Sequence, residues 1–145
     1  MTSVRSVLLA VIVFMCAAPI YSSATAAEVQ ATETASAFYM RWRSTVLSAK
    51  SVDELATFLD ADTLEQFKME PEPAKSETLP MMKRLYQQKN DVRVVKETPT
   101  PHGATLSLEA VDSEKGPLVG TVDVVKENGA WKISNAVERW KVVKK

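Results

Sequence analysis

Apolar residues recur at steps of three and four along residues 33–49, the first segment of the chain with a clear pattern. This spacing places them on one side of an α-helix and leaves polar residues on the other. We therefore expect an amphipathic helix over 33–49. Its predicted buried stripe consists of Ala35, Phe38, Tyr39, Trp42, Val46 and Ala49.

A second helix is expected to begin at Ser51. Ser51 and Glu54 have the spacing of a capping box, in which each residue satisfies a backbone amide of the first turn. The apolar residues that follow predict its buried face, which consists of Val52, Leu55, Ala56 and Leu59.

Two further helices are predicted before residue 90. Asp62 has the sequence context of a helix cap, so a short third helix is expected after it. The proline-containing segment 71–75 is expected to be a loop. Ser76 then caps a fourth helix in which Pro80 falls in the first turn, where an amide has no helical partner.

From residue 91 onward the apolar residues alternate with polar ones and β-branched residues become frequent. This pattern is typical of strands with one buried face, and it predicts strands over 92–98, 104–112, 118–126 and 131–140. Asn128-Gly129 is the signal of a two-residue hairpin turn. The expected inner residues of the second and third strands are Ala104, Leu106, Leu108, Ala110, Leu118, Val122 and Val124.

Helices followed by strands predict an α+β domain, with N-terminal helices packed on a curved, mainly antiparallel four-stranded sheet. The connections between the predicted strands are short, which favours an antiparallel meander. We expect one such domain over residues 28–145, because about 118 residues suffice for a single core.

Residues 1–27 differ from the rest of the chain. Arg5 is followed by an apolar run over 7–18 and then by small residues up to Ala27, which is the organisation of a secretory signal peptide. The run of 12 residues is shorter than the roughly 20 that span a bilayer. We therefore expect cleavage after Ala26 or Ala27, which removes Cys16, the only cysteine, and with it any disulfide or thiol chemistry.

The remaining composition excludes several classes of function. The chain has 18 basic and 18 acidic residues, and removing Arg5 with the signal gives a net charge of about −1, which predicts no nucleic-acid partner. His102 is the only histidine and lies in a predicted turn, so sites built on paired histidines are excluded. With four glycines and no phosphate-binding motif, we expect no cofactor and no metal.

The predicted order of elements resembles the nuclear-transport-factor-two-like (cystatin-like cone) superfamily, which includes small exported bacterial proteins. The residues that carry the resemblance are the aromatic helix with Tyr39 and Trp42, the helix that begins at Ser51, and the closing hairpin 124–133. The resemblance implies a cone-like fold with a pocket between the first helix and the sheet. It leaves function open, since the superfamily includes isomerases, dehydratases, ligand binders and assembly subunits.

Four side chains are candidates for lining such a pocket: Tyr39, Trp42, Asp123 and Trp131. Isomerases of the superfamily use a carboxylate base with tyrosine or acid donors, which would suit Tyr39 together with Asp123 or Glu109. Asp123 and Glu109 alternate with apolar neighbours, however, and are expected on the solvated face of the sheet. We therefore assign no catalytic residue.

A second group of candidates belongs to a protein-interaction surface. Residues 53–77 are rich in acids, and Asp60, Asp62 and Glu65 are the candidate contact residues. Met81 and Met82 could add an adaptable apolar contact.

Together these features predict an exported, non-enzymatic binding or protein-interaction domain of the bacterial cell envelope, periplasmic or secreted after signal cleavage. The expected partner is another envelope protein or a small apolar ligand, and membrane attachment is expected only if the signal is retained. The alternative is a small isomerase- or dehydratase-type enzyme with an acid/base carboxylate in the cone pocket.

Overall fold

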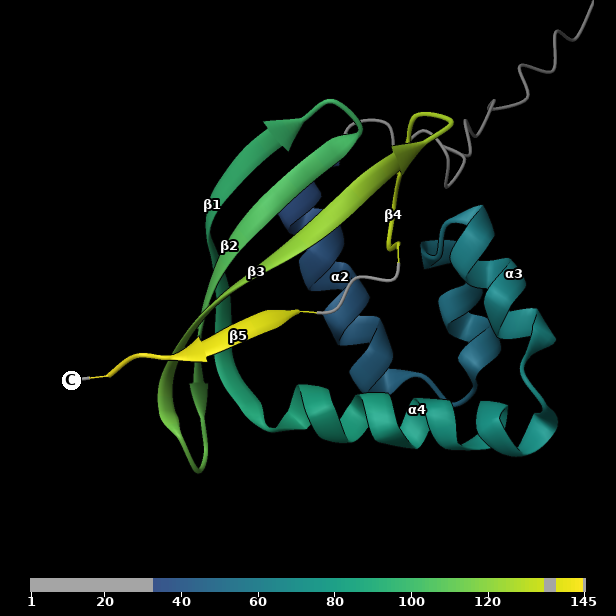
Figure 1. Ribbon diagram of the computed structural model, residues 1–145, viewed down its shortest axis with the longest axis horizontal. Helices are drawn as coiled ribbons and strands as arrows, with labels where there is room; N and C mark the ends of the chain where they lie inside the picture. Colours follow the sequence, from purple (N-terminus) through teal and green to yellow (C-terminus); the bar gives the residue numbers. More distant parts are fainter. Residues whose placement is uncertain (1–32, 135–137, 145) are drawn as a thin grey trace, which may run out of the picture.

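The computed structural model describes residues 33–134 and 138–144, which form an α+β fold. Within the described residues, four helical segments precede a curved, open antiparallel sheet, and Figure 1 shows the sheet wrapping around α2, with α4 across one end. The predicted fold class is confirmed. The predicted signal peptide, residues 1–27, lies outside the described residues. The elements are α2 (Ala35–Ser48), η1 (Val52–Phe58), α3 (Ala61–Met69), α4 (Glu72–Gln87), β1 (Lys89–Thr100), β2 (Gly103–Asp112), β3 (Gly116–Glu127), β4 (Ala130–Lys132) and β5 (Arg139–Val142).

Helix α2 is the centre of the core, as its apolar stripe predicts. The Thr34 side chain accepts a hydrogen bond from the Ala37 amide and so fixes where the helix begins. All six residues of the predicted stripe are buried. The Phe38 and Trp42 rings contact the Phe58 ring, with centroid distances of 5.9 and 5.6 Å.

The second helical segment, η1, is a 3₁₀-helix, and this changes its buried face. A 3₁₀-helix has three residues per turn, so Val52, Leu55 and Phe58 share one side. Leu55 and Phe58 are buried, Val52 and Leu59 are partly buried and pack against the core, and Ala56 is partly buried. The predicted face therefore includes three residues that contact the core, Val52, Leu55 and Leu59, but it omits Phe58, which the tighter helix buries.

Capping side chains start η1 and α3. The Glu54 carboxylate accepts from the Ser51 amide at 3.2 Å, as the capping box predicts. Helix α3 begins earlier than expected, because Asp60 is its cap and accepts from the Thr63 amide at 2.9 Å. Asp62, the predicted cap, lies in the first turn instead.

Helix α4 also begins earlier than expected. Its N-cap is Pro71, and Pro73 occupies the first turn, where its missing amide removes no helical hydrogen bond. The predicted loop over 71–75 is therefore mostly helix. As a result Pro80 lies inside the helix and not in its first turn.

The sheet has the order β1-β2-β3-β4, with all pairs antiparallel, and β5 also pairs with β3. The single fourth strand predicted over 131–140 is therefore wrong. After β4 the backbone turns to the helical layer, where the Ile133 amide donates to the Phe58 carbonyl at 2.7 Å and the Ile133 carbonyl accepts from the Asp60 amide at 3.0 Å. These two bonds draw the chain away from β3 before β5 returns to it.

The inner face of the sheet is the predicted one. Its seven expected residues on β2 and β3 are all at most 5% exposed. At Gly120, a Cβ atom would lie 2.6 Å from a carbon of the Trp140 ring, so the aromatic ring of β5 packs where a side chain would stand. The β3–β4 turn has positive φ at Asn128 and Gly129, 50° and 81°, as the Asn-Gly signal predicts.

None of the helices in the described ranges is long and apolar enough to span a bilayer.

Candidate functional site

The space between α2 and the sheet, where a pocket was expected, is filled by the core. Phe38 and Tyr39 from α2 and Leu106, Leu108 and Val122 from the sheet are at most 1% exposed. Side chains at this degree of burial leave no room for a ligand at native packing density. This region is therefore part of the hydrophobic core.

A cavity of about 540 Å³ lies beside α2, between α4 on one side and η1 and α3 on the other. A volume of this size is within the range of small-molecule sites, roughly 300–1,000 Å³. The C-terminal segment also contributes to it, through Ile133 and Glu138. The apolar lining consists of Val52, Leu55, Leu59, Phe67, Met81, Met82, Leu85 and Ile133, with the rings of Trp42 and Tyr86.

One face of α4 forms a wall of this cavity. Thr78, Met81, Met82, Leu85 and Tyr86 are separated by three or four residues and so project on the same side of the helix. From Thr78 to Tyr86 the helix rises by about 12 Å. The wall that α4 contributes therefore extends by about that length along the helix axis.

The Glu138 carboxylate is a polar group of this cavity and is hydrogen-bonded on both oxygens. Its Oε1 accepts from the Tyr39 hydroxyl at 2.5 Å and from Arg43 Nη1 at 3.0 Å. Its Oε2 accepts from Trp140 Nε1 at 2.7 Å. The Glu138 side chain is only 7% exposed, so the carboxylate is held by protein donors in place of water.

Arg43 is the cation that balances Glu138, and its side chain is 6% exposed. Its Nη2 donates to the carbonyls of Tyr86 at 3.3 Å and Lys89 at 3.5 Å. The guanidinium also lies 4.7 Å from the centre of the Tyr86 ring. Arg43 thus joins α2 to the C-terminal end of α4, to the start of β1 and to Glu138.

Two tyrosines of this cluster remain neutral. Burial raises the pKa of Tyr39 above its ordinary value, and the charge of Glu138 raises it further. The pKa of Tyr86 is raised by the same two causes, and its hydroxyl accepts from Trp42 Nε1 at 2.9 Å. Both phenols are therefore hydrogen-bonding groups and not anions at any physiological pH.

The structure brings two of the four predicted pocket residues to this site. Trp42 lines the cavity, and Tyr39 lies behind it as a donor to Glu138. Trp131 is buried elsewhere and donates from Nε1 to the Glu33 carbonyl at 2.7 Å. Asp123 lies on the outer face of the sheet, far from the cavity in the fold.

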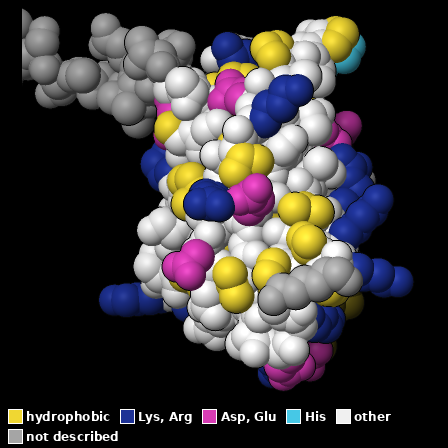
Figure 2. Space-filling view, turned by 90° about the vertical axis from the view of Figure 1, so that its left-hand side faces the viewer, with side chains coloured by type: hydrophobic (Ala, Val, Ile, Leu, Met, Phe, Trp, Pro, Cys, Tyr) yellow, Lys and Arg dark blue, Asp and Glu magenta, His cyan; other side chains and the backbone are white. Residues whose placement is uncertain are grey.

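The outer face of the sheet carries both carboxylates that had been considered as bases. Asp123 accepts from Arg139 Nη2 at 2.7 Å, and Glu109 accepts from Arg93 Nη2 at 2.5 Å. Hydrogen bonds from Thr105 and then from Arg139 hold the pKa of Asp123 below its usual range. Figure 2 shows this face, on which charged and hydrophobic side chains are interspersed. Neither carboxylate reaches the cavity.

The predicted interaction residues separate into two groups. Asp62 and Glu65 are exposed on α3, and Asp60 is half-buried as the cap of that helix. Burial opposes ionisation of Asp60, but hydrogen bonds involving Ser134 and Thr63 outweigh it and lower its pKa. Met81 and Met82 belong instead to the wall of the cavity.

Sequence reasoning missed Arg43, Tyr86 and Glu138 as members of the site. Arg43 carried a signal, because it lies four residues after Tyr39 and three before Val46, on the stripe that should be apolar. Glu138 had no such signal, since two of its three donors, Tyr39 and Arg43, come from α2, far away in the sequence.

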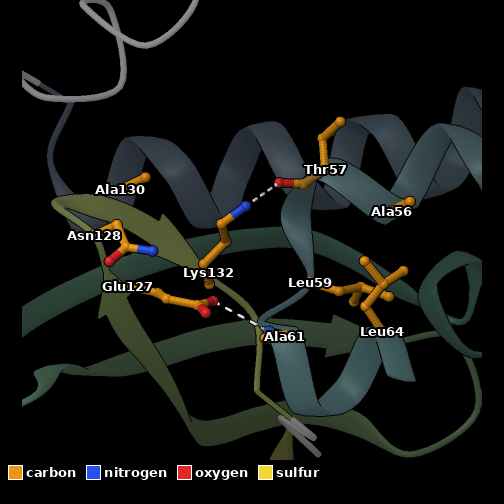
Figure 3. A pocket seen from close by; sticks show the side chains of 9 residues that line it. All are labelled: Ala56, Thr57, Leu59, Ala61, Leu64, Glu127, Asn128, Ala130 and Lys132. Carbon is orange, nitrogen blue, oxygen red and sulfur yellow. Dashed lines mark hydrogen bonds between the residues drawn. The ribbon is translucent and has the colours of Figure 1, made fainter. Parts of the chain in front are cut away.

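A second cavity, of about 530 Å³, lies between η1, α3 and the β3–β4 hairpin. Figure 3 shows Lys132 and Glu127 reaching from the hairpin towards the helical segments. Lys132 Nζ donates to the Thr57 carbonyl at 2.7 Å, and Glu127 Oε2 accepts from the Ala61 amide at 3.1 Å. Both charged groups thus attach the hairpin to the helices.

Within residues 33–134 and 138–144, no cluster of three or more histidine, cysteine or acidic side chains is arranged to hold a metal ion. Comparisons with protein-family models, with curated proteins and with solved structures found no match to this chain.

Proposed function

We propose that this protein is an exported, non-enzymatic binding domain that holds a small apolar ligand in the cavity between α4 and η1–α3. The observation that carries the proposal is the lining of that cavity: a wall of aliphatic, methionine and aromatic side chains around one paired carboxylate. Burying apolar ligand surface against such a wall is favourable by roughly 25 cal/mol per Å².

Export rests on the N-terminal sequence, whose charged, apolar and small-residue regions favour secretion into the periplasm or beyond. The resemblance to the cone superfamily, which also includes ligand binders, agrees with the same role. The proposal for the site, in contrast, depends only on the described residues.

Blocking the cavity tests the proposal. Met81 is 56% exposed and lines the cavity, so Met81→Trp adds an indole at its mouth without opening the core. We expect the affinity for a neutral apolar probe, N-phenyl-1-naphthylamine, to fall about tenfold, which corresponds to a loss of about 1.4 kcal/mol of binding free energy. Fluorescence titration measures the affinity.

The matched control is Met40→Trp. Met40 is 40% exposed on α2 and does not line the cavity, so its replacement should leave probe affinity within twofold of the unmodified protein. Circular dichroism verifies that both variants are folded. Equal binding by the two variants would contradict the proposal, as would failure of the unmodified protein to bind the probe.

The burial of Glu138 favours a second candidate function, an isomerase- or dehydratase-type enzyme. A buried carboxylate beside two neutral phenols is the kind of group that moves a proton in such reactions. Against this role, both oxygens of Glu138 already accept hydrogen bonds from protein donors, and one of them forms an ion pair with Arg43.

The two functions differ in how they depend on Glu138. Glu138→Gln keeps the size of the side chain but removes its basicity. If the protein catalysed proton transfer in α,β-unsaturated ketones or hydroxy acids, this variant should lose at least a hundredfold in kcat. The binding function predicts no turnover in either protein, and continuous absorbance assays distinguish the two outcomes.

A further inference from the structure

The cavity has opposite charges near the two ends of α4. Glu70 lies just before the helix and Lys89 just after it, and both line the cavity. The 16 residues of α4 rise by about 24 Å, so these two charges are well separated. A ligand lying along α4 would therefore contact an apolar wall with a negative charge near one end and a positive charge near the other, so its two orientations would differ in energy.

Lys89 is the cationic side chain at the other end of the cavity, and Asp112, its register partner on β2, interacts with it electrostatically. Arg43 and Glu138 form an ion pair there, whereas Lys89 forms no ion pair among the described residues and its Nζ lies 5.9 Å from the centre of the Trp140 ring. Lys89 Nζ donates to the Leu85 carbonyl at 2.8 Å, which also offsets the negative end of the helix dipole. No acidic side chain in the described parts of the chain pairs with Lys89, and an ammonium group has three donors.

The deep part of the cavity suits a ligand without polar groups. Every buried side-chain nitrogen and oxygen among the described residues already has a hydrogen-bond partner. A polar ligand group placed there would lose its bonds to water and gain none, which costs about 1–3 kcal/mol. The polar part of the ligand therefore belongs at an end of the cavity, where a charged side chain can meet it.

The wall itself suits a flexible chain. Met81, Met82 and Leu85 follow one another along α4, and methionine side chains adapt to ligands without a fixed outline. An unbranched hydrocarbon chain can lie along such a wall, which extends for about 12 Å from Thr78 to Tyr86.

We infer that the ligand is a linear amphiphile with one anionic head group, a free straight-chain carboxylate. This inference rests on the proposed function and names the ligand class of the same cavity. The chain lies along α4 against Met81, Met82 and Leu85, and the carboxylate lies at the Lys89 end, away from Glu70. Lys89 is thus the residue that distinguishes an anionic head from a neutral or cationic one.

The test compares three probes with the same chain and different heads: dodecanoate, 1-dodecanol and dodecyltrimethylammonium. Isothermal titration calorimetry at low salt, below the aggregation concentration of each probe, measures their affinities for the purified protein. We expect dodecanoate to bind most tightly and the cationic probe most weakly. Lys89→Gln should weaken dodecanoate about threefold to fivefold, the size of a solvent-accessible ion pair, and leave dodecanol unchanged.

Lys96→Gln is the matched control, because Lys96 is exposed on β1 and does not line the cavity. It should leave all three affinities unchanged. If dodecanol binds as tightly as dodecanoate and Lys89→Gln changes neither, the head-group assignment is overturned while the proposed function stands. If none of the probes binds, both are overturned.

The same anionic chemistry occurs in membrane lipids, and a second arm separates the two sources. Vesicles of phosphatidylglycerol, a two-chain anionic lipid, are sedimented with the protein. We expect no co-sedimentation beyond that with neutral phosphatidylcholine vesicles. Retention on the anionic vesicles that Lys89→Gln abolishes would overturn the assignment to a free carboxylate.

Discussion

At the scale of single residues, the ion pair between Arg43 and Glu138 stands out because both charged side chains are buried, which is uncommon in proteins. Two opposite charges, with side chains 6% and 7% exposed, have been removed from water and depend on each other. Such a pair is costly to break, because the remaining charge stays buried without a partner, whereas replacing both members is far less costly. The pair joins α2 to the segment that leads into β5 and so fixes one end of the cavity.

Arg43→Met should therefore destabilise the protein strongly. We expect the free energy of unfolding to fall by about 3–5 kcal/mol, measured by urea denaturation. The double variant Arg43→Met/Glu138→Gln should lose less than Arg43→Met alone, because no unpaired charge remains. Strictly additive effects of the two substitutions would show that the pair is not coupled.

The residues of the site show where sequence reasoning works and where it stops. Tyr39 and Trp42 were identified because helical periodicity is local and places them on a known face. Glu138 belongs to the site because two donors from α2, more than 90 residues earlier in the chain, converge on it together with the nearby Trp140, and no spacing in the sequence encodes that convergence. Asp123 was misleading as a pocket candidate, since alternation within β3 turns it to the outer face.

At the scale of secondary-structure elements, the helices and strands with long, regular apolar patterns were predicted correctly. Helix α2 and strands β2 and β3 agree with the sequence because their apolar residues keep one period over ten or more positions. The start of α4 was wrong because prolines are tolerated in a first turn, which made the segment resemble a loop. The fourth strand was wrong because backbone bonds to Phe58 and Asp60 compete with pairing to β3.

Helix α3 should be the least stable helix of the fold. It has no buried residue, and its apolar side chains Leu64 and Phe67 are only partly covered. Amide hydrogen exchange followed by mass spectrometry should give α3 an opening free energy lower than that of α2 by more than about 2 kcal/mol. Because Phe67 lines the cavity, a bound ligand should slow exchange in α3 more than in β2. Equal protection of α2 and α3 would contradict this picture.

At the scale of the whole molecule, the order of elements was enough to predict an α+β fold, because helices and strands occupy separate halves of the chain. The position of the cavity was not predictable in the same way. It depends on how four consecutive helical segments pack on one another and on where the C-terminal segment, with Ile133 and Glu138, meets them, and this tertiary packing has no signature in a local pattern. The sheet and α2 thus form the packed core of the fold, and the candidate site lies beside this core.

The interruption between β4 and β5 has a consequence for how this protein behaves at high concentration. Residues 122–124 of β3 lack a ladder partner on that side among the described residues, so this edge offers only short stretches of continuous pairing. On the opposite edge, β1 has two irregularities in its register and contains Pro99. Short, irregular or proline-containing edges are poor templates for a strand from another molecule. We therefore expect little edge-to-edge association of the sheet along either border when the purified protein is concentrated.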